Sequence, residues 1–223
     1  MSTGILERHI KQNCDPNLRG LLSLSINEAY RFLDDLIQNN PVLQRDEMKK
    51  SYGHIRNGLI DVAIKEVLSK TKLPHKIADK TTSKNRNGYT YLMIEVRGAI
   101  LTSAKVMKPH NFPRSAKNRS FNSLKNRQYN LFSNPEDLNE KYDENNPPYI
   151  IITYGGDNHK LEFIQLGLPK DDASGWIDRI DITKVPVLLI NETEIVNDLN
   201  LTLTKESERI IQEGEKRAKG EII

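Results

Sequence analysis

The sequence predicts an α+β fold: a mainly antiparallel sheet, N-terminal helices packed on it and a C-terminal helix. Two observations lead to this class. Apolar residues recur at helical spacing from about residue 25 to about residue 70, and beyond about residue 75 they follow the alternating spacing of strands. Turn-forming residues such as Arg97-Gly98 then separate consecutive strand-like segments, which is typical of antiparallel neighbours. Because no repeat or linker-like stretch interrupts the chain, we expect a single domain over residues 1–223.

Two helices are expected before the sheet. The segment 1–24 has a weak pattern and supports no prediction. Ser25 and Glu28 have the spacing of a capping box, which predicts that the first helix begins at Ser25. The apolar face of this helix comprises Ala29, Tyr30, Phe32, Leu33, Leu36 and Ile37. Asn39-Asn40-Pro41 separates it from a second helix, which is expected over residues 46–69.

Strands are expected where aromatic and β-branched residues concentrate. Their predicted ranges are 75–79, 89–96, 99–107, 149–154, 161–168, 176–182 and 185–190. Among them lies a basic, moderately helical stretch over residues 114–127. On this helix, Phe121 and Leu124 are expected to face the core. Lys117 and Asn118 are expected to face solvent.

Three further segments complete the predicted organisation. Residues 134–148 are acidic, rich in Asn and bounded by Pro, which predicts an exposed loop. Pro186 favours an edge position for the last strand. Residues 203–223 are expected to form a charged terminal helix with Leu203, Ile210 and Ile211 as its apolar anchors, and this helix is a candidate for homodimerisation.

The charge of the chain is unevenly distributed. Residues 70–127 contain fourteen Lys and Arg residues but two acids, Asp79 and Glu95, so this segment carries about +12. Since the formal net charge of the whole chain is +3, the remaining residues carry about −9. Such segregation is typical of a surface that contacts polyanions, and nucleic acid is the leading candidate.

The basic stretch that begins at Arg114 gives the strongest functional signal. It combines cations with Ser and Asn hydrogen-bonding groups and interleaved aromatic residues, and no acid occurs between Val96 and Pro135. Such groups supply affinity for the sugar–phosphate backbone of DNA or RNA. The residues expected to contact phosphate are Arg97, Lys105, Arg114, Lys117, Arg119, Lys125 and Arg127. The alternative is a solvated helix face that is balanced by nearby acids such as Glu136 and Asp137.

The predicted order of helix, three strands, helix and further strand resembles the restriction-endonuclease-like core, PD-(D/E)xK. That family places one acid on its second core strand and an acid-x-lysine on the third, around a divalent metal ion. The resemblance implies a metal-dependent nuclease-like core, active or degenerate, with Mg²⁺ as its cofactor if it is active. No other cofactor is expected. The sequence departs from the family pattern because it has no Pro-Asp, and because Ser103 stands two residues before Lys105 in place of an acid.

Within this resemblance, four residues are candidates for catalysis. Glu95 lies on the second predicted strand and Lys105 on the third, and Asp79 and Glu66 are candidates to support them. Asp79 and Glu95 are the candidate metal ligands. The alternative is that Glu95 forms a cross-strand ion pair with Arg97 or Lys105, which stabilises a sheet by about 0.2–1 kcal/mol.

A second resemblance concerns the middle of the chain. The stretches YTYLMIEVRGAI and NFPRSAKNRSFNSLKNRQYNLF are similar to an uncharacterised domain family of bacteria and their mobile elements. In that family a hairpin also precedes a helix rich in Arg, Lys and Asn. The resemblance implies a bacterial or phage origin and transfers no catalytic residue.

Two other functions stay open. The first is a protein-interaction module, such as a defence, counter-defence or regulatory component, whose basic face docks an acidic partner protein. The second is an enzyme that acts on a nucleotide or another small anion. The single cysteine, Cys14, excludes an intrachain disulfide and a cysteine-based zinc site. The N-terminal residues have neither the basic start nor the long apolar run of a signal peptide, and no apolar run is long enough to cross a bilayer, so a cytoplasmic protein without membrane contact is expected.

Overall fold

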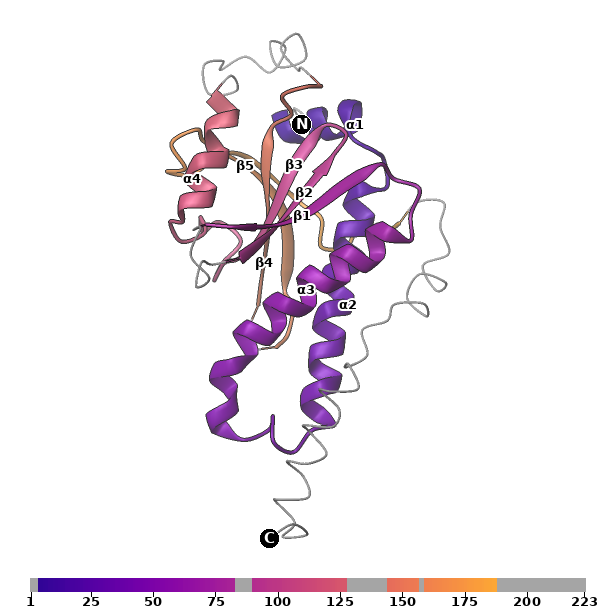
Figure 1. The fold of residues 1–223 in the computed structure, drawn as a ribbon, viewed down its shortest axis with the longest axis vertical. Helices are drawn as coiled ribbons and strands as arrows, with labels where there is room; N and C mark the ends of the chain where they lie inside the picture. Colours follow the sequence, from indigo (N-terminus) through magenta and orange to yellow (C-terminus); the bar gives the residue numbers. More distant parts are fainter. Residues whose placement is uncertain (1–3, 83–89, 128–143, 157–158, 188–223) are drawn as a thin grey trace.

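The computed structural model describes residues 4–82, 90–127, 144–156 and 159–187 (Figure 1). Within these residues, six strands form one sheet in the order β1-β2-β3-β4-β5-β6. The strands are β1 (His75–Thr81), β2 (Thr90–Val96), β3 (Ala99–Lys105), β4 (Tyr149–Gly155), β5 (Phe163–Pro169) and β6 (Trp176–Asp181). The α-helices are α1 (Ile5–Asn13), α2 (Leu18–Gln38), α3 (Tyr52–Ser69) and α4 (Lys117–Ser123), and the 3-10 segments are Asp46–Ser51 and Leu124–Asn126. The fold is α+β with a mostly antiparallel sheet, so the predicted class is confirmed.

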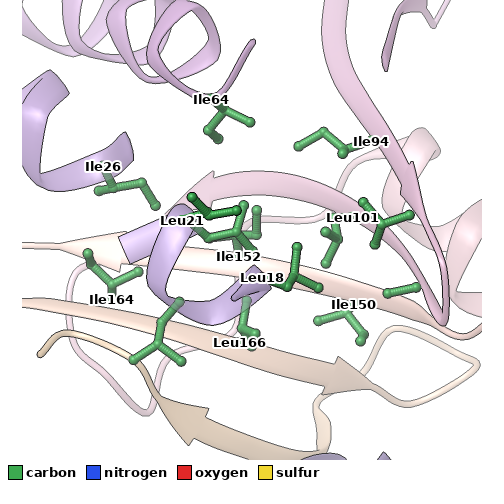
Figure 2. Close-up of a cluster of buried hydrophobic side chains, with 14 of the residues drawn as sticks. Leu18, Leu21, Ile26, Ile64, Ile94, Leu101, Ile150, Ile152, Ile164 and Leu166 are labelled. Carbon is green, nitrogen blue, oxygen red and sulfur yellow. The ribbon is translucent and has the colours of Figure 1, made fainter. Parts of the chain in front are cut away.

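Helices α2 and α3 lie side by side on one face of the sheet, and α4 lies on the other (Figure 1). Apolar side chains of the helices, such as Leu21 and Ile64, face Ile94, Leu101 and Ile152 on the strands, and all five are buried (Figure 2). Burial of one such side chain stabilises a fold by about 1.5–3 kcal/mol. This cluster therefore holds α3 firmly against β2 and β3.

The pairing of β3 with β4 is parallel, whereas the other neighbouring pairs are antiparallel. Parallel neighbours need a crossover connection, and α4 lies on the segment that makes it. A buried amide fixes the end of this segment. The side chain of Asn126 donates to the carbonyl oxygens of Tyr149 (2.8 Å) and Pro169 (2.9 Å), and it accepts from the backbone N–H of Tyr149 (2.8 Å).

The predicted orientation of α4 is wrong. Lys117 is exposed as predicted. Asn118, however, is buried, whereas Phe121 and Leu124 are 72% and 57% exposed. Apolar periodicity predicts the opposite orientation, but a helix of 7 residues does not enforce it. Because the hydrogen bonds of Asn126 connect the end of α4 to β4 and β5, they set the rotation of the helix and turn its amide face toward the sheet.

The predicted start of the first long helix is also wrong. Helix α2 begins at Leu18, and Ser25 lies buried in its middle, where its hydroxyl donates to the carbonyl oxygen of Leu21 (2.7 Å). Glu28 contacts Arg31 and caps no helix end. The weakly patterned segment 1–24 holds α1 and the beginning of α2. A serine can hydrogen-bond one turn back inside a helix, so the capping pattern alone does not mark a helix start.

The other predicted boundaries agree with the structure to within a few residues. Helix α2 ends before Asn39-Asn40-Pro41, and the strands fall within or close to their predicted ranges. The described part of the last predicted strand, residues 185–187, is not a strand. The predicted terminal helix over 203–223 lies outside the described residues, as does most of the predicted loop over 134–148. Within the described ranges, no helix has both the length and the apolar content to span a membrane.

Candidate functional site

The cleft with the largest excess of cations among the described lining residues, named the main cleft, forms where β2 and β3 separate. These strands are paired only between Ile94–Leu101 and Val96–Ala99, whereas β3 and β4 are paired through Lys105. Among their described residues, the first half of β2 and the second half of β3 are therefore not paired with each other. A cleft of about 540 Å³ occupies this end of the sheet. Its lining residues are Asn57, Asp61, Tyr91, Leu92, Ser103, Ala104, Lys105, Val106, Met107, Asn111, Phe112, Arg114, Arg119 and Tyr154.

The cleft has a positive charge. Among its described lining residues, three are cations (Lys105, Arg114 and Arg119) and one, Asp61, is an acid. The Arg119 guanidinium donates through Nε to the carbonyl oxygen of Arg114 (3.1 Å), so the two arginines are held at the same part of the rim. Concave surfaces lined by one sign of charge focus the field and concentrate ions of the opposite sign. The arrangement therefore favours an anionic ligand.

Asp61 projects from α3 into the cleft. Its carboxylate accepts a long hydrogen bond from the Ser103 hydroxyl (3.4 Å). Burial raises the pKa of Asp61 to about 6, although the bond from Ser103 and the charge of Lys65 oppose the shift, and the charge of Asp79 adds to it. The negative charge in the cleft is thus reduced below about pH 6, which makes the cleft more positive.

Neutral hydrogen-bonding groups line the cleft beside the cations. The Tyr154 hydroxyl on β4 donates to the Asn57 side-chain oxygen on α3 (3.0 Å). Asn57 and Asp61 are four residues apart, so they lie on the same side of α3. Hydroxyl and amide groups of this kind bind phosphate oxygens and sugars in nucleic-acid complexes.

The structure does not assemble the predicted pair of metal ligands. In the β1–β2 register, Asp79 lies opposite Leu92, and Glu95 lies opposite Lys76. Since side chains alternate between the faces of a sheet, Asp79 points to the α3 side and Glu95 to the α4 side. Both oxygens of Asp79 also accept from Lys65 Nζ, at 2.9 Å each. The two carboxylates therefore do not fit a shared Mg²⁺ ion.

Glu95 and Glu66 are also apart from Lys105. Glu95 pairs with Ile100 at the start of β3, whereas Lys105 ends that strand and points to the opposite face. Glu66 follows Asp61 by five residues, which places it about 140° around the axis of α3. Across the part of the chain that the structure describes, no group of three or more His, Cys, Asp or Glu residues has the geometry of a metal site. Of the four predicted catalytic residues, Lys105 alone is among the described residues that line the cleft.

The predicted phosphate-contacting residues divide into separate groups. Lys105, Arg114 and Arg119 line the main cleft. Arg97 and Lys125 line a second cleft, where they lie with Glu95 and Glu144. Arg97 pairs with Glu144 there, with 3.3 Å between the guanidinium nitrogen and the carboxylate oxygen. Lys117 on α4 and Arg127 after it are exposed.

This division follows from the fold. Arg97 lies in the turn that joins β2 to β3, at the opposite end of β3 from Lys105. The described lining of the second cleft holds three cations (Lys76, Arg97 and Lys125) and two acids, against three cations and one acid in the main cleft. Three of the seven predicted residues therefore lie at the main cleft, which has the larger excess of cations over acids, and the other four lie elsewhere.

Sequence reasoning missed Asp61, Ser103, Asn57 and Tyr154 as site residues. For the two residues on α3, Asn57 and Asp61, the sequence does contain a pattern that could have indicated them. Asn57, Asp61 and Lys65 recur at four-residue spacing beside the apolar positions of α3, which is the pattern of a polar stripe at the edge of a buried face. No local pattern indicates Tyr154, because its place in the cleft depends on the pairing of β4 with β3.

Comparisons of the chain with models of protein families, with curated proteins and with solved structures found no match.

Proposed function

We propose that the chain binds nucleic acid, and that the main cleft between β2 and β3 contacts its phosphate backbone. The observation that carries the proposal is the charge of this cleft: Lys105, Arg114 and Arg119 line it, and among the described lining residues Asp61 is the sole acid. A surface that gathers cations around neutral hydrogen-bond donors is suited to phosphate groups, which are charged and accept hydrogen bonds.

The three cations have distinct placements. Lys105 ends β3 and is partly buried, which suits it to a phosphate that enters the cleft. Arg114 is exposed at the rim, and Arg119 is partly buried and anchored to the Arg114 carbonyl oxygen. Nε and one terminal nitrogen of Arg119 both donate to that carbonyl oxygen, so this edge of the guanidinium is already occupied. A guanidinium can bind two oxygens of one phosphate through one edge, so Arg114 and the other edge of Arg119 support a phosphate at the mouth of the cleft.

Salt dependence provides the direct test. Each phosphate contact that releases a counterion contributes about 0.7 to 0.9 to the slope of log K against log salt. We expect fluorescence anisotropy to show binding of a labelled oligonucleotide near ~50 mM salt and a slope that corresponds to several contacts. Lys105→Ala should weaken binding and reduce the slope by about one contact. Lys50→Ala, at an exposed position in the 3-10 segment before α3, is the control. Absence of any binding to DNA or RNA would reject the proposal.

The proposal concerns binding and includes no cleavage step. The candidate metal ligands Asp79 and Glu95 point to opposite faces of the sheet, as the register of β1 and β2 requires. A nuclease-like core that has lost its metal ligands and retains a cationic cleft is consistent with this arrangement. Plasmid cleavage with Mg²⁺ or Mn²⁺ is the assay that addresses an active core.

A further inference from the structure

The outer face of α4 has an unusual composition for a surface helix. Phe121 in α4 is 72% exposed and Leu124, in the 3-10 segment that follows, is 57% exposed, while Asn118, Asn122 and Asn126 are buried. Phe121 follows Lys117 by four residues, so the two side chains are neighbours on the same side of the helix. The structure thus presents an aromatic ring to solvent beside a cation.

The size of this face limits what can cover it. A stable protein interface buries about 800 Å² on each partner, whereas one aromatic side chain buries about 150–250 Å². Phe121 and Leu124 together therefore supply a small part of a protein interface. A nucleobase, in contrast, needs one exposed ring on which to stack.

The charge around the ring restricts the ligand further. Lys117 and Arg114 precede Phe121, and the sequence has no acid from Arg97 to Asn134. A second copy of this chain would bring the same cations onto the same face and would be repelled. A strand of nucleic acid supplies negative phosphates for the cations together with flat bases for the ring.

We propose that the outer face of α4 selects single-stranded nucleic acid by stacking a base on Phe121, while the strand continues into the cleft at Arg114. This inference rests on the proposed function, since it requires that the cleft bind phosphates. In a duplex the bases are stacked on each other and are not accessible to a surface ring. Stacking on Phe121 consequently distinguishes single strands from duplexes, whereas the cations of the cleft bind both.

The test compares a single-stranded oligonucleotide with the duplex of the same sequence by anisotropy. Phe121→Ala should weaken single-strand binding by about 5- to 100-fold, because stacking of a base on an aromatic side chain has an effect of this size. Duplex binding should change by less than about twofold. The salt slope should stay as in the wild type, since no charge is removed. Phe121→Trp should retain the affinity, and its added tryptophan emission should be quenched by the single strand.

Matched controls separate stacking from other effects. Leu124→Ala removes an apolar neighbour without removing a ring, and it should change single-strand affinity by less than about threefold. Because Phe121 is exposed, the urea midpoint of Phe121→Ala should match that of the wild type. Poly-L-glutamate is an acidic polymer without bases, so it tests whether the face recognises an acidic protein instead of nucleic acid. It should displace the strand more readily from Phe121→Ala than from the wild type.

The outcomes distinguish this inference from the proposed function. If the wild type binds neither single strands nor duplexes, the proposed function fails and this inference fails with it. If the wild type binds nucleic acid but Phe121→Ala binds single strands as tightly as the wild type does, the cleft proposal stands and the stacking proposal is overturned. Equal displacement of the strand by poly-L-glutamate from both proteins would also overturn it, because the face would then recognise charge alone.

Discussion

The Ser103 hydroxyl on β3 and the Asp61 carboxylate on α3 meet in the main cleft, where Ser103 donates a hydrogen bond across 3.4 Å. This contact joins the helical layer to the sheet at the point where β2 and β3 separate. It also places Asp61 among Lys105, Arg114 and Arg119, where it is the one acid among the described lining residues. The charge state of Asp61 therefore controls how positive the cleft is.

Asp61→Asn should increase the affinity for nucleic acid near neutral pH. The substitution removes a negative charge from the cleft and retains a group that can bond Ser103. Wild-type affinity should rise as the pH falls from about 7.5 to about 5.5, since Asp61 becomes protonated near its pKa of about 6. The variant should lack this part of the pH dependence. Because both proteins contain the same histidines, the comparison removes the contribution of the histidines to the pH dependence. Anisotropy at constant ionic strength measures both effects, and parallel pH profiles for the two proteins would contradict the assignment.

The same carboxylate should influence stability in a defined direction. Its pKa is raised in the folded state, from 3.8 to about 6, so folding favours the protonated form. The stabilisation that protonation provides is complete below about pH 4 and is lost as the pH rises through about 6. The free energy of unfolding of the wild type should therefore fall over this range relative to that of Asp61→Asn. Urea denaturation at several pH values tests this, and the opposite sign would show that Asp61 is stabilised as the anion.

Asn126→Ala should destabilise the fold by about 2–4 kcal/mol, because it removes buried hydrogen bonds and leaves the N–H of Tyr149 without this acceptor. Asn39→Ala is the matched control. Its side chain donates to the Asp35 carbonyl oxygen at an exposed position, and it should cost less than about 1 kcal/mol. Chemical denaturation measures both. A loss for Asn126→Ala as small as that of the control would mean that α4 is not held by this amide.

Gly98→Ala should destabilise the turn between β2 and β3. The φ angle of Gly98 is +83°, and an added Cβ would lie 2.5 Å from the carbonyl oxygen of Asn13. The left-handed conformation alone costs a non-glycine residue about 1–2 kcal/mol, and the backbone clash adds to this. Gly58→Ala in α3 meets no atom within 4 Å, and it should stabilise the protein by about 0.5–1 kcal/mol. Thermal denaturation should show a lower Tm for Gly98→Ala and a higher Tm for Gly58→Ala than for the wild type. Shifts of Tm in the same direction would contradict the prediction.

Glu95→Ala should leave nucleic-acid binding and any metal-dependent cleavage unchanged. Glu95 points to the α4 side of the sheet, away from Asp79, Ser103 and Lys105. A plasmid incubated with Mg²⁺ or Mn²⁺ and either protein should give the same pattern on a gel. Cleavage by the wild type that disappears in Glu95→Ala would restore Glu95 as a catalytic residue and would require a different arrangement of the sheet.

The parts of the fold that could be predicted are those with local causes. Alternation in YTYLMIEV reveals β2, and the glycine at position 98 reveals its turn, because both effects act between neighbours in the sequence. The beginning of α2 could not be predicted from Ser25 and Glu28, since their hydrogen bonds are equally possible inside a helix. The orientation of α4 depends on Asn126 and on β4 and β5, which no periodicity in α4 reveals.

The candidate site was predictable in charge but not in geometry. The sequence indicates a basic segment, and three of its cations line the main cleft. It does not indicate that β2 and β3 separate after three paired positions, which creates the cleft and brings Asp61 to Ser103. Strand register also decides that Asp79 and Glu95 occupy opposite faces, and register is a long-range property.

The most direct test of the central claim compares two double variants that remove the same charge from the two clefts. Arg114→Gln with Arg119→Gln alters the main cleft, and Arg97→Gln with Lys125→Gln alters the second cleft, where Glu95 and Glu144 accompany the cations. In a salt titration against one oligonucleotide, the first variant should reduce the slope of log K against log salt by about 1.4–1.8, whereas the second should change it by less than about 0.5. Equal losses in the two variants would show that the protein attracts nucleic acid through its overall charge, and would contradict a binding site in the main cleft.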